Sequence, residues 1–160
     1  MKKRGLLNRR SLRLAWLILA VAAAGPCMAQ AVVISEAWAR ATVPGQRASG
    51  VFMKIKAREP VRLMSVFSPV AVLAEVHQMA VEDGVMTMRA VEGGLALPSG
   101  KTLEFKSGGY HLMLLDLKQP LVANTVLPLT LVLRDAQGKI SRTSLQVPVT
   151  TSAPPSTAMQ

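Results

Sequence analysis

Cysteine is almost absent from this sequence: Cys27 is the only one among 160 residues, and it lies near the N-terminus. The chain downstream of it therefore contains no intramolecular disulfide, no cysteine nucleophile and no thiolate ligand for zinc or blue copper. Histidine is nearly as scarce, because only His77 and His111 occur. Thiol chemistry is excluded, and imidazole chemistry depends on these two positions.

Acidic residues are also few, and the net charge is +10. The first 31 residues contain six basic residues and no acidic one. The remaining thirteen basic and nine acidic residues leave a net charge of +4, and the basic ones are scattered without interleaved aromatics. We therefore predict no nucleic-acid partner.

Residues 1–31 have the pattern of a cleaved secretory signal peptide. A basic stretch precedes the apolar stretch Leu14–Ala24, and Ala29-Gln30-Ala31 forms an A-x-A-like cleavage site, with cleavage after Ala29 as an alternative. The apolar stretch is shorter than the roughly 20 residues that span a bilayer. We therefore expect no membrane span in the mature protein, and a retained anchor is the alternative.

Two details bear on the export route. Arg9-Arg10 resembles a twin-arginine signal, but Arg13 interrupts the apolar residues that should follow, which favours Sec export. Pro26 precedes Cys27 where a lipoprotein signal has a small residue, so we expect no lipid anchor. The predicted location is the periplasm.

After the signal, turn dipeptides separate short apolar or alternating segments. Strands are expected around 51–55 and at 61–67, 70–81, 85–91, 102–105, 110–117, 125–134 and 143–149, with a helix over 70–81 as the main alternative. Frequent short strands predict an antiparallel sandwich or barrel over residues 32–149. Residues 150–160, rich in Ser, Thr, Pro and Ala, are predicted to be a flexible tail.

Each histidine lies two residues before a methionine, in His77-Gln78-Met79 and in His111-Leu112-Met113. Residues two apart in a strand point to the same face. Each pair can therefore present an imidazole and a thioether side by side. In the second segment Leu112 is expected to face the core, which puts His111 and Met113 on the opposite face or at its rim.

The Asp83-Gly84 dipeptide is a strong signal for a two-residue hairpin turn. If these residues form the turn, Met79 lies directly opposite Met88, and His77 lies diagonal to Met88. Cβ atoms are about 5 Å apart in opposed pairs and roughly 7 Å apart in diagonal ones, so long side chains can converge on one ion. A one-residue slip of register would send one strand's ligands to the other face.

Two imidazoles and two or more thioethers are soft, neutral ligands that suit Cu(I) rather than Mg²⁺, Ca²⁺ or zinc. Methionine also remains usable in an oxidising compartment, where paired cysteines close into disulfides. An isolated His-x-Met is more often structural, and methionine commonly fills cores. Met53 and Met64 are expected to be core, Met159 is expected to have no role, and Met79 and Met86 stay open between ligand, reserve ligand and packing.

At these residues the chain resembles the periplasmic copper chaperones of the PCuAC type, which supply the copper-A centre of cytochrome c oxidase. That family carries His, ten residues, Met, about twenty-one residues, then His-x-Met. Here ten residues separate His77 from Met88, and twenty-two separate Met88 from His111. The segments 37–45, 108–113 and 127–131 extend the resemblance over most of the chain.

The resemblance implies an all-β, cupredoxin-like or immunoglobulin-like antiparallel sandwich of seven to nine strands. It implies Cu(I) held by His77, Met88, His111 and Met113, with Met79 and Met86 as possible auxiliary ligands. It also implies donation by ligand exchange to a partner such as oxidase subunit II or another copper chaperone. The long His/Met-rich C-terminal tail of some relatives is missing, which puts a second, Cu(II)-type site in doubt.

Three other functions compete with a chaperone. A copper-buffering or resistance protein without a dedicated acceptor would have the same site, and a metal-free interaction module would have the same fold. A copper redox enzyme would need an open coordination position. The sequence shows no paired acid and base and no activated nucleophile, so we do not expect an enzyme. Acid is expected to release the metal, because protonated imidazole cannot bind it.

Overall fold

The computed structural model describes residues 31–82 and 84–154, and it is built from strands alone. Residues 1–30 of the predicted signal peptide and the last six residues of the predicted tail lie outside the described residues. The described part contains no helix, so none there could cross a membrane. The ten strands are β1 (Val32–Arg40), β2 (Ala48–Ala57), β3 (Val61–Phe67), β4 (Ala71–Glu82), β5 (Val85–Ala90), β6 (Leu95–Leu97), β7 (Thr102–Phe105), β8 (Tyr110–Leu117), β9 (Val126–Asp135) and β10 (Ile140–Thr150).

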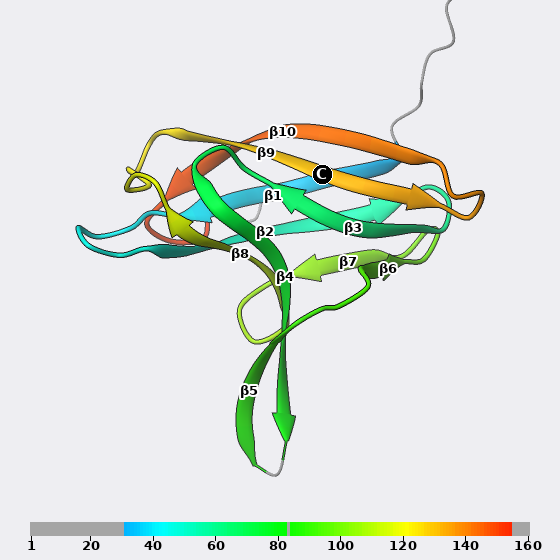
Figure 1. Cartoon of the computed structure of the whole chain (residues 1–160), viewed down its shortest axis with the longest axis horizontal. Helices are drawn as coiled ribbons and strands as arrows, with labels where there is room; N and C mark the ends of the chain where they lie inside the picture. Colours follow the sequence, from blue (N-terminus) through cyan, green and yellow to red (C-terminus); the bar gives the residue numbers. More distant parts are fainter. Residues whose placement is uncertain (1–30, 83, 155–160) are drawn as a thin grey trace, which may run out of the picture.

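The strands form two layers that meet where β1 pairs in parallel with β10. One layer has the order β5-β4-β8-β7-β2-β1, with β8 also pairing β2 directly, and the other has the order β10-β9-β3-β6. Figure 1 shows β3, β9 and β10 lying over β1 and β2. The prediction of an all-β sandwich is confirmed, and the parallel pairs β1–β10 and β7–β8 accompany its antiparallel ladders.

Alternation along the strands places the core between the layers. In β9 the leucines at 127, 129, 131 and 133 are at most 1% exposed, whereas the residues between them are partly exposed. In β8, Leu112 and Leu114 are fully buried, so the opposite side of this strand carries His111 and Met113. The predicted division of β8 into a core face with Leu112 and an opposite face with His111 and Met113 is therefore confirmed.

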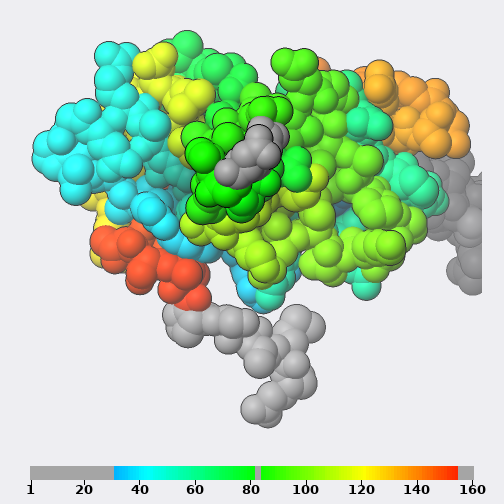
Figure 2. All heavy atoms as spheres, turned by 90° about the horizontal axis from the view of Figure 1, so that it is seen from below, coloured from blue at the N-terminus to red at the C-terminus, as the bar shows by residue number. Residues whose placement is uncertain are grey.

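The segment 70–81 is a strand and not the alternative helix, and it extends beyond the body of the protein. β4 pairs with β8 from Ala71 to Gln78, and with β5 from His77 to Glu82. Its outer third, residues 79–82, therefore pairs only with β5, and the β4–β5 hairpin projects from the sandwich (Figure 1). Figure 2, viewed from that side, shows the green hairpin atoms over the middle of the face. The two histidines lie where this hairpin leaves the layer.

Candidate metal centre

The two histidines are direct cross-strand partners, His77 in β4 and His111 in β8. Directly opposed residues of an antiparallel pair point to the same face. Their ring centroids are 6.0 Å apart, and the ring planes are inclined by 58°. His111 is 7% exposed, and the His77 side chain is 12% exposed. Two imidazoles from distant parts of the chain are thus adjacent and largely shielded from solvent.

Thioethers surround this pair in the register that the hairpin signal predicts. Met79 is paired with Met88 across the β4–β5 turn, which confirms that prediction, and His77 is therefore diagonal to Met88. On the other side, Met113 is paired with Glu75 and is diagonal to His77. All these positions lie on one face of the layer, because they are separated by even numbers of residues along each strand.

Each imidazole uses one nitrogen in a hydrogen bond, so in its neutral form the other nitrogen has a free lone pair. His111 Nδ1 lies 3.1 Å from the Gly109 carbonyl oxygen, which can only accept, so Nδ1 carries the proton and Nε2 has a lone pair. His77 Nε2 lies 3.1 Å from Glu75 Oε2, so the proton is on Nε2 and the lone pair is on Nδ1. His77 Nδ1 is buried and has no hydrogen-bond partner. Metal-binding histidines typically have this arrangement, in which the second nitrogen is held by a carboxylate or carbonyl.

Glu75 is a site residue that the sequence analysis missed. Its side chain is 35% exposed, and it contacts His77 from two residues earlier on the same face of β4. A carboxylate two residues before a histidine in a strand is the signal that could have found it. Its oxygen is engaged with His77 Nε2, so Glu75 orients the ring rather than adding a hard ligand.

A cavity of about 310 Å³ lies beside the histidine pair, and its lining includes Met79, His111 and Met113. Gly50 also lines it and is the β2 residue that pairs with Met113. A Cβ atom at Gly50 would lie 2.8 Å from the tip of the Phe52 ring, which borders the same cavity. The lack of a side chain at position 50 therefore lets the Phe52 ring pack against the backbone at this edge of the cavity.

The remaining methionines divide by burial. Met53 is 2% exposed, so its predicted place in the core is confirmed, and Met64 is partly buried in β3. Met88 is 50% exposed and Met86 is 59% exposed, both on the projecting hairpin. Met159 lies outside the described residues. The described residues contain no group of three or more His, Cys, Asp or Glu side chains able to hold a metal, so an ion at the histidine pair needs thioether ligands.

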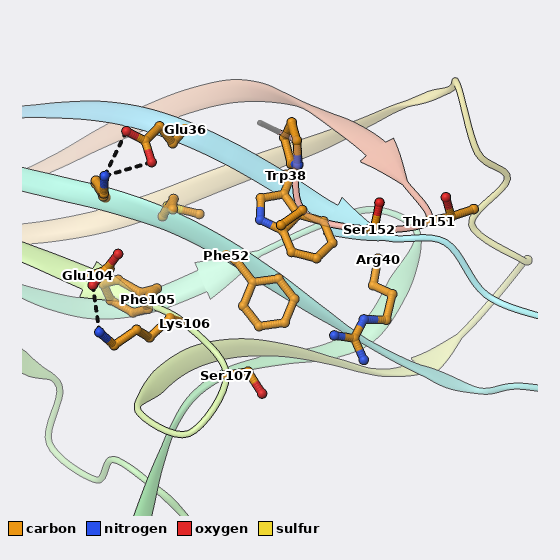
Figure 3. Close-up of a pocket in the computed structure, with 14 residues that line it drawn as sticks. Glu36, Trp38, Arg40, Phe52, Glu104, Phe105, Lys106, Ser107, Thr151 and Ser152 are labelled. Atoms are coloured by element: carbon orange, nitrogen blue, oxygen red, sulfur yellow. Dashed lines mark hydrogen bonds and ion pairs between the residues drawn. The ribbon is translucent and has the colours of Figure 1, made fainter. Parts of the chain in front are cut away.

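A second cavity of about 610 Å³ adjoins the first and shares Arg40, Phe52 and Ser107 with it (Figure 3). Trp38 stacks on Phe52 with ring centroids 4.6 Å apart, and the Arg40 guanidinium lies 5.7 Å from the centre of the Phe52 ring. The cavity contains no histidine, and its one methionine is buried Met53. This cavity shares Phe52 with the cavity beside the histidine pair but offers no ligand set of its own.

Charges at the rim of this second cavity are paired. The Lys54–Glu36 and Lys106–Glu104 contacts are each 2.8 Å, and Figure 3 shows both as dashed lines. The hydrogen bond to Glu36 raises the pKa of Lys54, and the hydrogen bond from Lys106 lowers the pKa of Glu104. These two pairs cancel their own charges, which leaves the positive charge of Arg40, a residue of both cavities, beside the histidine site.

Comparison with known proteins gives one family and one fold. The family model described as “LpqE-like: Putative lipoprotein LpqE-like” matches residues 32–149. A protein of Leifsonia xyli subsp. xyli (strain CTCB07), described as “Putative lipoprotein Lxx21020”, is 31% identical over 121 residues, covering 76% of this chain and 70% of that protein.

Solved PCuAC domains have the same fold at low sequence identity. The “Copper-bound PCuAC domain from PmoF2” is 20% identical with a TM-score of 0.59, covering 76% of this chain and 94% of that one. The “Solution structure of CuI-DR1885 from Deinococcus Radiodurans” is 24% identical with a TM-score of 0.56, covering 83% and 84%. The resemblance to PCuAC domains is thus confirmed at the level of the fold.

Proposed function

We propose that this chain, which belongs to the LpqE-like family and has the fold of PCuAC domains, is a Cu(I)-binding protein that carries the ion and passes it on. The observation that supports this most strongly is the pair of imidazole nitrogens not used in the hydrogen bonds to Glu75 and Gly109, His77 Nδ1 and His111 Nε2. They belong to adjacent rings on one face, and His77 Nδ1 is buried without a partner. A nitrogen–metal bond is about 2 Å long, so the 6.0 Å between the ring centroids is compatible with one ion bound by both rings.

Met88 and Met113 complete the proposed ligand set from the two diagonal positions beside His77. Four neutral ligands leave one positive charge at the site, which suits Cu(I) and disfavours hard divalent ions. Related folds are described as a copper-bound PCuAC domain and as a Cu(I) form of DR1885, and this supports the choice of ion.

The proposed mechanism is ligand exchange without bond cleavage in a substrate, so we assign no enzymatic reaction. Met88 is half exposed, whereas the histidines are nearly buried. An acceptor's ligand can therefore replace Met88 first and draw the ion outward while the imidazoles still hold it. We propose the copper-A centre of cytochrome c oxidase as the final destination and the periplasm as the compartment, in line with the N-terminal pattern.

X-ray absorption on the Cu(I)-loaded protein tests the ligand set. We expect two nitrogen and two sulfur neighbours in the wild type, and fewer sulfur neighbours in Met88→Leu and in Met113→Leu. Met64→Leu is the matched control, because Met64 lies in β3 of the other layer. Unchanged sulfur scattering in both site variants would exclude this ligand set.

The acceptor is tested separately. Transfer of Cu(I) from the loaded protein to a purified copper-A domain should proceed without free copper in solution, as monitored in the presence of a chelator that traps released ion. Tight binding without transfer would favour the copper-buffering alternative.

A further inference from the structure

The hairpin face that carries His77 continues outward as a row of apolar and thioether side chains. Beyond the His77–Ala90 pair come the pairs Met79–Met88 and Val81–Met86. Opposed residues share a face, and positions two apart along a strand share it as well. The two outer pairs therefore bring three methionines together, Met79, Met86 and Met88, which we call the outer thioether cluster.

The register makes these three sulfur-bearing side chains mutual neighbours. Met79 is directly opposite Met88, and Met86 is diagonal to Met79 and two residues from Met88 on the same strand. Cβ atoms in such relationships are about 5 to 8 Å apart, and the flexible methionine side chains can close that gap around one ion.

Core packing does not account for these methionines. Met86 is 59% exposed and Met88 is 50% exposed. Val81, the cross-strand partner of Met86, is 68% exposed, so the outer part of the hairpin is in solvent on this face. Side chains that are half or more exposed fill no gap in a core, and apolar residues gathered in this way at a projecting edge indicate a binding role.

Met79 links the outer cluster to the histidine site. It lines the 310 Å³ cavity together with His111 and Met113, although its own strand partner Met88 is on the open hairpin. An ion held by the three thioethers can thus move inward by exchanging Met86 for an imidazole, while Met79 or Met88 stays bound. The ion's charge and oxidation state do not change in this step.

We infer that Met79, Met86 and Met88 form a second, outer site for a soft monovalent ion, through which the ion enters and leaves the histidine site. This inference rests on the proposed function for the identity of the ion and for the histidine site that it reaches. The outer site has three neutral sulfur ligands, which suit Cu(I). Its lack of imidazole makes it the weaker and faster-exchanging of the two sites.

The test removes the imidazoles and keeps the thioethers. In His77→Gln/His111→Gln, titration with Ag(I), a redox-stable soft ion, should still show one bound ion, and methyl NMR of labelled methionines should show shifts at Met79, Met86 and Met88. Adding Met86→Leu should weaken this binding by at least the roughly tenfold to hundredfold that loss of a supporting group costs a metal site. Adding Met64→Leu instead should leave it unchanged.

The outcomes separate the two proposals. If the double histidine variant folds and binds no Ag(I), or if Met86→Leu leaves its binding intact, the outer site is overturned while the histidine site stands. If the wild type binds Ag(I) and Cu(I) no more tightly than the double variant, the histidine site is overturned instead.

A second measurement keeps the inference testable if the double variant fails to fold. In the wild type, the first equivalent of Ag(I) should shift the Met113 methyl signal. A second equivalent, which finds Met88 engaged in the histidine site and only Met79 and Met86 available, should bind more weakly and shift the Met86 signal. In Met86→Leu, release of Cu(I) to an excess of chelator should be slower at unchanged affinity. A Met86 signal that does not respond to excess Ag(I), or an unchanged release rate, would overturn the outer site.

Discussion

His77 and His111 are direct partners across β4 and β8, with ring centroids 6.0 Å apart. The strands that carry them also supply the groups that fix their tautomers, Glu75 from β4 and the Gly109 carbonyl beside β8. A geometry that depends on strand register is stiff, because a slip by one residue would turn one of the rings to the other face. The site is therefore largely formed before an ion arrives.

Glu75→Gln should weaken Cu(I) binding about tenfold to a hundredfold, because Glu75 orients His77 and supports its basicity without touching the ion. The hydrogen bond at 3.1 Å from His77 Nε2 is the contact at stake. Competition titration against a Cu(I) chelator measures the change. Glu59→Gln, in the turn between β2 and β3, is the matched control. Equal affinities of the two variants would show that Glu75 has no positioning role.

The parts of the site that could be predicted from sequence are those governed by local rules. The Asp83-Gly84 signal predicted the observed pairing of Met79 with Met88, because a two-residue loop leaves one register. The alternation of side chains along β8 likewise predicted that Leu112 and His111 point to opposite faces, because neighbouring residues in a strand always do. Both relationships involve residues close together in the chain.

The parts that could not be predicted are set by contacts between distant segments. The pairing of His77 with His111 depends on β8 lying next to β4, which no local pattern specifies. Strand β1, at Val32–Arg40, was not predicted, because buried and exposed residues do not alternate regularly along it around the left-handed residue Glu36. Strand β6 was missed because it has only three residues, Leu95–Leu97.

Gly84→Ala should loosen the hairpin and weaken Cu(I) binding. Gly84 has φ of +80° with no atom crowding its Cβ position, so alanine there costs roughly 1–2 kcal/mol through backbone strain alone. Hydrogen exchange of the β4 and β5 amides should become faster. Gly138→Ala, with φ of +84° in the remote β9–β10 turn, should carry a similar strain and leave Cu(I) affinity unchanged. Equal effects of the two variants on affinity would contradict a role for the hairpin.

Gly50→Ala should disturb the site from the side of β2. The new methyl group would meet the tip of the Phe52 ring at 2.8 Å, and the ring is too buried to swing freely into solvent. Such overpacking typically costs about 1–3 kcal/mol, measurable by thermal or chemical denaturation. Phe52 stacks on Trp38, the only tryptophan after residue 31, so its fluorescence should change as well.

The matched control for that substitution is Gly138→Ala, which loses a similar amount of stability, roughly 1–2 kcal/mol, through backbone strain in the remote β9–β10 turn. We expect this variant to keep the Trp38 fluorescence of the wild type. Reduced Cu(I) affinity in Gly50→Ala but not in Gly138→Ala would link the cavity beside Met113 to metal binding, whereas wild-type affinity in both would separate them.

The mature N-terminus is predicted to start at Gln30 or Val32, after cleavage at the A-x-A-like site. Either cut removes Cys27, the only residue that could carry a lipid, although the family and its Leifsonia relative are described as lipoproteins. Pro26 is the reason for this expectation, since a lipoprotein signal needs a small residue before the cysteine. Intact mass spectrometry of the exported protein distinguishes cleavage at the A-x-A-like site from lipidation at Cys27. A mass that includes a diacylated Cys27 would contradict cleavage at this site and would attach the proposed copper site to a membrane surface. In that case Cys27→Ser would abolish processing of the signal peptide.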